Sequence, residues 1–111
     1  MASELAAQRC EACNRLTPAV TGDRLEQLRA ELHPGWEVVD GVQLRRRFRF
    51  PDFAGAFARL QQVAALAEEE GHHPDCCVGW GHLTVELTTH AIHGLSRNDF
   101  VLAAKIDALG D

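Results

Sequence analysis

The feature that most constrains the fold is an alternating segment from Gln43 to Phe50, with apolar side chains on one face and arginines on the other. The apolar face holds Leu44, Phe48 and Phe50, interrupted by Arg46, and the other face holds Arg45, Arg47 and Arg49. Residues two apart share a face of a β-strand, so this period predicts a half-buried strand. We expect the arginine row on a solvated or ion-paired sheet face, because three arginines on an acidic chain make only a small nucleic-acid surface.

Turn and stop signals bracket this strand. Asp40-Gly41 is a favoured two-residue hairpin turn. The short apolar segment 36–39 before it completes a predicted hairpin. Pro51 ends the strand, since proline has no backbone N–H to donate to a neighbouring strand.

A long helix is predicted to follow. Asp52 is suited to cap its first turn, and the helix is expected to run to about Glu70. Gly71 suits the position just past the end, where a left-handed backbone is common. The expected apolar stripe is Phe53, Phe57, Leu60, Val63, Ala64 and Ala67.

The remaining segments complete an α+β pattern. We predict a helix over 23–32, strands over 76–79 and 82–90, and a last helix opened by a capping box from Ser96 to Asp99. Hairpin-linked strands separated by helices imply two layers: a four-stranded antiparallel sheet with three helices packed on one face. Residues 1–22 are the least patterned and are expected to form a loosely packed N-terminal arm, with 23–111 as a single domain.

Composition narrows the class of protein. The chain has 111 residues, 46% of them hydrophobic, which is enough to bury a core without metal or disulfide help. Its net charge of −5 argues against nucleic-acid binding, which usually shows as a basic excess. No apolar run is long enough to span a membrane, and the N-terminus lacks the pattern of a secretory signal, so a cytoplasmic protein with reduced cysteines is expected.

A histidine cluster is the candidate functional site. His72, His73 and His90 lie near the carboxylates Glu68 and Asp99. Imidazoles titrate near neutral pH and suit proton transfer. The spacing alone leaves three interpretations open: catalysis, a structural role, or metal binding. A histidine beyond a helix end can simply favour the helix dipole, and Asp99 can simply complete the capping box.

The metal interpretation depends on the cysteines. Cys10 and Cys13 form one Cys-x-x-Cys pair, whereas a structural zinc site usually has a second pair. Cys76 and Cys77 are adjacent and would point to opposite faces of a strand. We therefore predict no metal site, and the arm pair stays open as either inert or redox-sensitive.

The cluster has a fixed spacing that matches a known family. Its members here are Glu68, His72, His73, Pro74, Trp80, His90 and Asp99. This pattern resembles the pterin-4a-carbinolamine dehydratases over roughly residues 16 to 109. The resemblance implies the α+β fold described above, dimers or dimers of dimers, and no cofactor. It also implies a reaction: dehydration of 4a-hydroxytetrahydrobiopterin to quinonoid dihydrobiopterin.

The resemblance also implies residue roles. His72 and His90 would be the acid–base groups, and His73 would bind and position the pterin. Glu68 would hydrogen-bond the substrate or a histidine, and Asp99 would orient His90. Pro74 and Trp80 would complete the substrate-binding and orienting set.

Some segments resemble one branch of that family, the dehydratase-like proteins proposed as Rubisco assembly factors, some of them carboxysome-associated. These segments are Val78 to Gly81, His90 to Ile92, Asn98 to Phe100 and Ala103 to Ile106. The branch implies a binding role with the Rubisco large subunit as partner and little or no catalysis. Both functions, hydro-lyase and assembly factor, stay open from the sequence.

Overall fold

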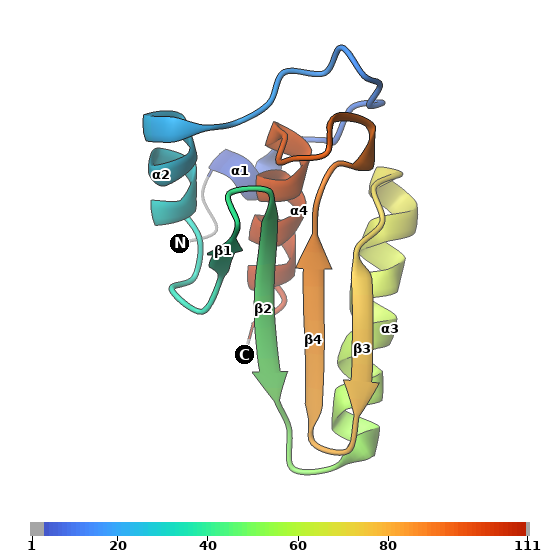
Figure 1. Cartoon of the computed structure of the whole chain (residues 1–111). Helices are drawn as coiled ribbons and strands as arrows, with labels where there is room; N and C mark the ends of the chain where they lie inside the picture. Colours follow the sequence, from blue (N-terminus) through green and yellow to red (C-terminus); the bar gives the residue numbers. More distant parts are fainter. Residues whose placement is uncertain (1–3, 111) are drawn as a thin grey trace.

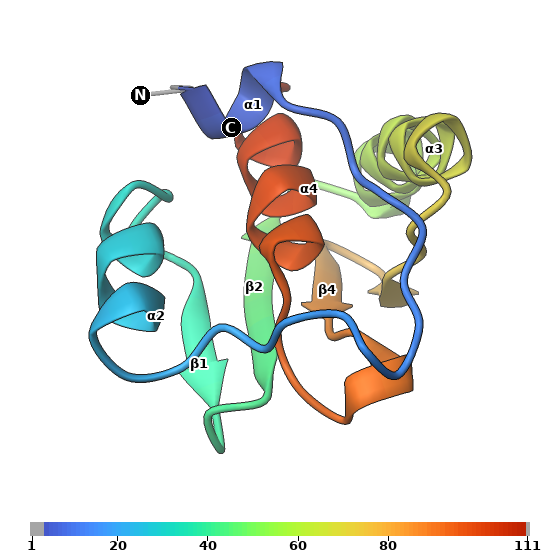
Figure 2. The same cartoon turned by 90° about the horizontal axis from the view of Figure 1, so that it is seen from above.

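The structure is a computed structural model that describes residues 4–110. Its elements are α1 (Glu4–Ala7), α2 (Gly22–Ala30), β1 (Glu37–Val39), β2 (Gln43–Arg49), α3 (Phe53–Glu70), β3 (Asp75–Gly79), β4 (His82–Leu87), the 3-10 helix η1 (His90–Ile92) and α4 (Arg97–Asp107). The four strands form an antiparallel sheet in the order β1-β2-β4-β3 (Figure 1). Helices α2, α3 and α4 lie on one face of it (Figure 2), which confirms the predicted α+β architecture.

The core lies between the sheet and α4. Leu44 of β2 pairs with Leu87 of β4, and Phe48 pairs with Leu83, so one face of both strands is apolar and buried. Phe100 of α4 is fully buried against this layer. The alternation seen in the sequence therefore decides which face of the sheet the helices cover.

Arg46, the interruption in the apolar face, is buried rather than solvated. Its Nη1 lies 2.5 Å from Oδ1 of Asp107, and its guanidinium lies 4.2 Å from the centre of the Phe48 ring. Asp107 also accepts hydrogen bonds from Nε1 of Trp36 (2.9 Å) and from the backbone N–H of His33 (2.9 Å). This carboxylate ties the end of α4 to β2 and to the segment before β1, so the arginine is a cross-link inside the fold.

The buried face of α3 differs from the predicted stripe. Phe53 and Phe57 are 47% and 44% exposed, and Ala64 is also exposed. The residues that the helix buries are Ala56, Arg59, Val63, Ala67 and Glu70. Ala56 is fully buried, and the guanidinium of Arg59 lies over the rings of Phe48 and Phe50. A pattern based on hydrophobicity does not predict this face, because the face includes Arg59 and Glu70. These charged side chains are buried where specific partners bind them.

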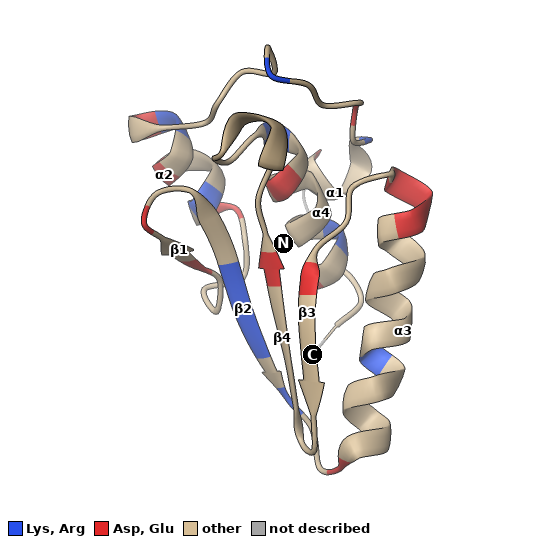
Figure 3. Ribbon diagram, turned by 45° about the vertical axis from the view of Figure 1, so that its right-hand side comes forward, with Lys and Arg blue, Asp and Glu red and all other residues tan. Residues whose placement is uncertain are grey.

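The open face of the sheet carries the arginine row (Figure 3). Arg45 pairs with Glu37 of β1 at 2.9 Å and lies 3.8 Å from Glu86 of β4. Arg47 and Arg49 are exposed to solvent. The prediction of a solvated, partly ion-paired face is confirmed.

The N-terminal arm packs more closely than expected. Helix α1 lies against α4 (Figure 2), and Leu5 is 2% exposed within the main core. Lys105 of α4 donates a hydrogen bond to the carbonyl of Ala6 at 2.8 Å. The expectation of loose packing is therefore wrong for α1, whereas most of residues 11–19 are exposed and the division into an arm and a domain over 23–111 stays a prediction. No helix in the described part of the chain is long and apolar enough to cross a membrane.

Replacing Asp107 tests the cross-link at the end of α4. Asp107→Ala removes the contact of 2.5 Å between the carboxylate of Asp107 and the buried guanidinium of Arg46, and loss of one such contact from a buried ion pair costs about 3 kcal/mol. We expect the free energy of unfolding in urea to fall by about that amount. Glu26→Ala on the exposed side of α2 is the matched control and should change it by less than about 0.5 kcal/mol. Equal effects of the two substitutions would contradict the cross-link.

Candidate active site

The end of α3 brings the first two histidines to the site. Gly71 has φ of +67°, and its N–H donates to the carbonyl of Ala67 at 2.9 Å, as in a glycine-terminated helix. The chain then turns sharply, and Pro74 leads it into β3. Because the glycine stops the helix at this point, His72 and His73 lie between a rigid helix and a rigid strand.

His72 pairs with Asp99. Its Nε2 lies 2.6 Å from Oδ1 of the carboxylate, and the side chains are 10% and 0% exposed. The other oxygen, Oδ2, accepts from the N–H of Ser96 (2.9 Å) and from the hydroxyl of Thr89 (2.8 Å). Asp99 therefore completes the predicted capping box of α4 and also holds an imidazole, so its two proposed roles coexist.

The partner of Asp99 differs from the one that the family resemblance implied. Strand β4 ends at Leu87, and Thr89 bridges to Gly94, which closes a tight loop that holds η1. His90 lies in this loop and is exposed, while its neighbour Thr89 points inward to Asp99. Among the described residues Asp99 contacts His72 and not His90, so an orienting role of Asp99 toward His90 stays a prediction. The same carboxylate nevertheless links His72 to the residue that precedes His90.

Glu68 contacts His73 rather than His72. Nε2 of His73 lies 2.5 Å from Oε2 of Glu68, and both side chains are well exposed, at 60% and 77%. A solvated pair of this kind contributes little to stability. Glu68, His73 and Pro74 all line a pocket of about 210 Å³.

Trp80 does not join the histidines. It lies in the turn between β3 and β4 and is 71% exposed. The histidines His72 and His73 precede the start of β3, whose five residues span roughly 16 Å at about 3.3 Å each. Within one chain the turn that holds Trp80 is therefore at the opposite end of the sheet (Figure 1), and its substrate-orienting role stays a prediction.

Hydrogen bonding decides what His72 can do chemically. An ionised carboxylate only accepts, so Nε2 of His72 carries the shared proton and Nδ1 of the neutral ring is left as an acceptor. Thr89 and Ser96 are buried, and their hydroxyls lie 2.7 Å apart. They fix Asp99 in turn, so the imidazole has one orientation. The role of Thr89 was not predicted from the sequence. The available signal is its spacing: Thr89 follows Leu83 at an even interval, which places it on the buried face of the segment.

Glu70 is a second buried carboxylate that sequence analysis did not single out. Its Oε1 accepts from the N–H of Cys10 at 2.8 Å, and its Oε2 lies 3.0 Å from Arg9 and 3.8 Å from Lys105. Burial alone would raise the pKa of Glu70, but the Cys10 hydrogen bond and the charges of Lys105 and Arg9 together lower it. The carboxylate of Glu70 therefore holds the arm in place, and Glu70 lies two residues before His72 in the sequence.

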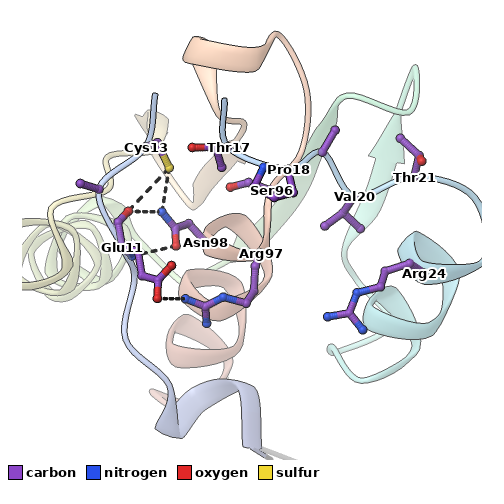
Figure 4. A pocket seen from close by; sticks show the side chains of 12 residues that line it. Glu11, Cys13, Thr17, Pro18, Val20, Thr21, Arg24, Ser96, Arg97 and Asn98 are labelled. Atoms are coloured by element: carbon purple, nitrogen blue, oxygen red, sulfur yellow. Dashed lines mark hydrogen bonds and ion pairs between the residues drawn. The ribbon is translucent and has the colours of Figure 1, made fainter. Parts of the chain in front are cut away.

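A larger pocket of about 450 Å³ lies between the arm, the start of α4 and Arg24 of α2 (Figure 4). Arm residues, the first turn of α4 and Arg24 of α2 line it. None of the three histidines borders it. Within residues 4–110, no group of three or more histidine, cysteine or carboxylate side chains is arranged to hold a metal ion.

These features define a small α+β domain with a histidine–carboxylate cluster at one end of its sheet. The sequence pattern described as Pterin 4 alpha carbinolamine dehydratase matches residues 18–109. A protein from Rubrobacter xylanophilus, whose name assigns it provisionally to these dehydratases, is 50% identical over 107 residues, which cover 96% of this chain and 99% of the relative. A similarly named protein from Methylococcus capsulatus is 43% identical over 109 residues, which cover 97% and 95%.

Solved structures agree with the sequence relatives. A structure described as a transcriptional coactivator/pterin dehydratase from Brucella melitensis superposes with a TM-score of 0.78 at 32% identity, over 85% of this chain and all of that one. A pterin dehydratase-like protein described as a RuBisCO assembly factor in the alpha-carboxysome superposes with a TM-score of 0.58 at 30% identity, over 69% of this chain and 90% of that one. The chain therefore belongs to the pterin-4α-carbinolamine dehydratase family, as the motif predicted.

Thr89 offers a test of the network that holds Asp99. Thr89→Val keeps the shape of the side chain but leaves a buried carboxylate oxygen one hydrogen bond short, which costs about 1–3 kcal/mol of unfolding free energy. Thr89→Ser keeps the hydroxyl and should therefore lose less unfolding free energy than Thr89→Val. Urea unfolding of both variants measures this, and a serine variant as unstable as the valine variant would contradict the role of the hydroxyl.

Glu70 predicts a dependence of stability on pH. Its folded-state pKa lies below its unfolded value of 4.5, so the carboxylate stabilises the fold above that pH and loses its contribution as the pH falls below it. Glu70→Gln should therefore lower the free energy of unfolding at pH 7 by about 2 kcal/mol. The difference in unfolding free energy between wild type and variant should become smaller below pH 4.5. A gap that stays constant down to pH 3 would contradict the prediction, as denaturant titrations at several pH values would show.

Proposed function

We propose that the protein is a hydro-lyase that dehydrates 4a-hydroxytetrahydrobiopterin to quinonoid dihydrobiopterin and water. The observation that carries this proposal is the buried contact of 2.6 Å between Nε2 of His72 and Asp99, with His73 next to it and His90 next to Thr89. Membership of the family supplies the class of substrate. The chemistry requires only proton transfer, which the imidazoles of this cluster can supply without a cofactor.

His72 is suited to act as the base. Asp99 accepts the Nε2 proton and fixes the ring, so Nδ1 is free to take the proton that the pterin ring nitrogen loses. Asp99 also stabilises the imidazolium that forms, because an opposite charge at hydrogen-bond distance favours the charged ring. The carboxylate needs no rearrangement during the step, since Thr89 and Ser96 already hold it.

His90 is suited to act as the acid. The 4a-hydroxyl leaves as water once it is protonated, and the adjacent ring nitrogen supplies the electron pair that expels it. His90 is exposed in η1, and no hydrogen bond of its side chain is found among the described residues, so both ring nitrogens can reach a ligand. His73, in contact with Glu68 beside a pocket that both residues line, is assigned to binding and positioning the pterin.

The proposal predicts which histidines matter. His72→Ala and His90→Ala should each lower kcat/KM for loss of the 4a-hydroxyl by about a hundredfold or more, the usual contribution of an acid–base group. His82→Ala at the far end of the sheet is the matched control and should keep most of the activity. Stopped-flow absorbance of the purified variants measures the rates, with circular dichroism as a check on folding. Wild-type turnover no faster than the spontaneous reaction would overturn the proposal.

A second candidate function is that of an assembly factor that binds the Rubisco large subunit. The structural likeness to the pterin dehydratase-like assembly factor supports it, together with the branch-like segments of the sequence. Under this proposal the chain co-purifies with the large subunit from cells that contain Rubisco, and its deletion lowers the yield of assembled Rubisco. No association and an unchanged yield would count against it.

Self-association to a homodimer or homotetramer is part of both proposals. The exposed rings of Phe53 and Phe57 stack with centres 6.3 Å apart, an apolar surface that a second copy of the chain can cover. Sedimentation equilibrium measures the state, and a monomer at all concentrations would contradict this part.

A further inference from the structure

The arm carries a cysteine pair that the proposed function leaves unexplained. Cys10 and Cys13 lie on a segment, residues 9–14, that is neither helix nor turn. Both sulfurs contact one residue of α4: the thiol of Cys10 lies 3.6 Å from the carbonyl oxygen of Asn98, and Nδ2 of Asn98 lies 2.9 Å from the sulfur of Cys13 (Figure 4).

Asn98 holds the arm between these cysteines. Its side-chain Oδ1 accepts from the N–H of Glu11 at 3.0 Å, and its Nδ2 donates to the carbonyl of Glu11 at 2.6 Å. A residue whose own N–H and C=O face the same partner has an extended backbone, as in a β-ladder. The docked arm is therefore extended at Glu11, and the thiol of Cys13 contacts the carbonyl of the same residue at 3.6 Å.

An extended segment keeps the two sulfurs from bonding. With Glu11 extended and Ala12 outside the positive-φ region, the segment does not form the tight turn that would bring the α-carbons of Cys10 and Cys13 together. A disulfide needs a separation of about 4.4–6.8 Å, which a tight turn provides. Bending the arm into that turn takes Glu11 away from Asn98. The docked arm and the Cys10–Cys13 disulfide thus exclude each other.

We propose that Cys10 and Cys13 form a thiol–disulfide switch whose oxidation releases the arm from Asn98. The oxidant is a small-molecule disulfide. The thiolate of Cys13 attacks it, forms a mixed disulfide and expels one thiolate. The thiolate of Cys10 then attacks the sulfur of Cys13 and expels the second. The two cysteines each lose a proton to water, the two leaving thiolates each gain one, and one disulfide replaces another.

The two cysteines differ in readiness for this exchange. Burial, together with the nearby charge of Glu70, raises the pKa of the Cys10 thiol to about 12, so a docked Cys10 is a poor nucleophile. Cys13 lines the open pocket under the arm and is reached first. Attack by Cys10 follows once the mixed disulfide has displaced the arm.

Release of the arm would affect the histidine cluster through two residues that the arm contacts, Asn98 and Glu70. Asn98 directly precedes Asp99, and the N–H of Cys10 is bonded to Glu70, two residues before His72. Undocking also opens the pocket of about 450 Å³, since Glu11, Ala12 and Cys13 form one of its walls. The effect on turnover depends on the proposed dehydratase activity, whereas the release of the arm does not.

Hydrogen–deuterium exchange of the full chain tests the switch. Protein equilibrated with oxidised or reduced glutathione is digested under non-reducing conditions, and the peptide over residues 5–13 is followed by mass spectrometry. We expect a Cys10–Cys13 disulfide in the oxidised sample and exchange of the arm amides about tenfold faster than in the reduced sample. If the chain is also a dehydratase, its kcat/KM should fall on oxidation and recover with dithiothreitol.

Matched variants separate the switch from other causes. Cys13→Ser keeps a polar group at Asn98 but forms no disulfide, so its arm exchange should not respond to oxidised glutathione. Cys76→Ser/Cys77→Ser removes the exposed thiols of β3 and should respond like wild type. Asn98→Ala frees the arm without oxidation and should form the disulfide faster. A disulfide that forms with unchanged arm exchange, or a stable glutathione adduct on Cys13 without disulfide, would overturn the proposal. Neither outcome bears on the dehydratase activity.

Discussion

The carboxylate of Asp99 is the interaction on which the rest of the site depends. It is fully buried, and it binds three parts of the chain at once: the start of α4 through Ser96, the end of the β4 segment through Thr89, and the turn after α3 through His72. A buried charge is tolerated only when its hydrogen bonds are satisfied, so these partners have little freedom. The cost of burying the group is thus offset by bonds that also give a histidine one fixed orientation.

Two other carboxylates organise the molecule in the same way. Asp107 ties the far end of α4 to Arg46 and Trp36, and Glu70 ties the arm to the end of α3. Helix α4 is therefore anchored to the sheet at both ends, and the arm is anchored next to the site. Apolar burial gives the fold its stability, whereas these buried polar contacts decide how the layers are aligned.

The sequence predicted the architecture well because its signals are local. The alternation around Leu44 and Phe48, the cap at Asp52, the glycine at 71 and the box at Ser96 each act over a few residues and agree with one another. Errors arose where a long-range partner decides the outcome. Arg59 and Glu70 lie on the buried face of α3, where apolar residues were expected, because partners distant in sequence bind them.

The candidate site shows the same limit. The motif includes both His72 and Asp99, but spacing alone did not reveal that these two side chains contact each other. Trp80 matched the spacing and yet lies at the opposite end of the sheet, because the length of β3 separates it from the histidines. Thr89 and Asn98 had no chemical signature of their own, since their roles come from the groups they hold in place.

The double-mutant cycle of His72→Ala and Asp99→Asn on dehydratase turnover tests the central claim most directly. If Asp99 acts on the reaction through His72, each substitution lowers kcat/KM and the double variant is about as slow as the slower single variant. Losses that multiply in the double variant would show that the two groups act independently. That result would contradict the account of a histidine oriented by a buried carboxylate.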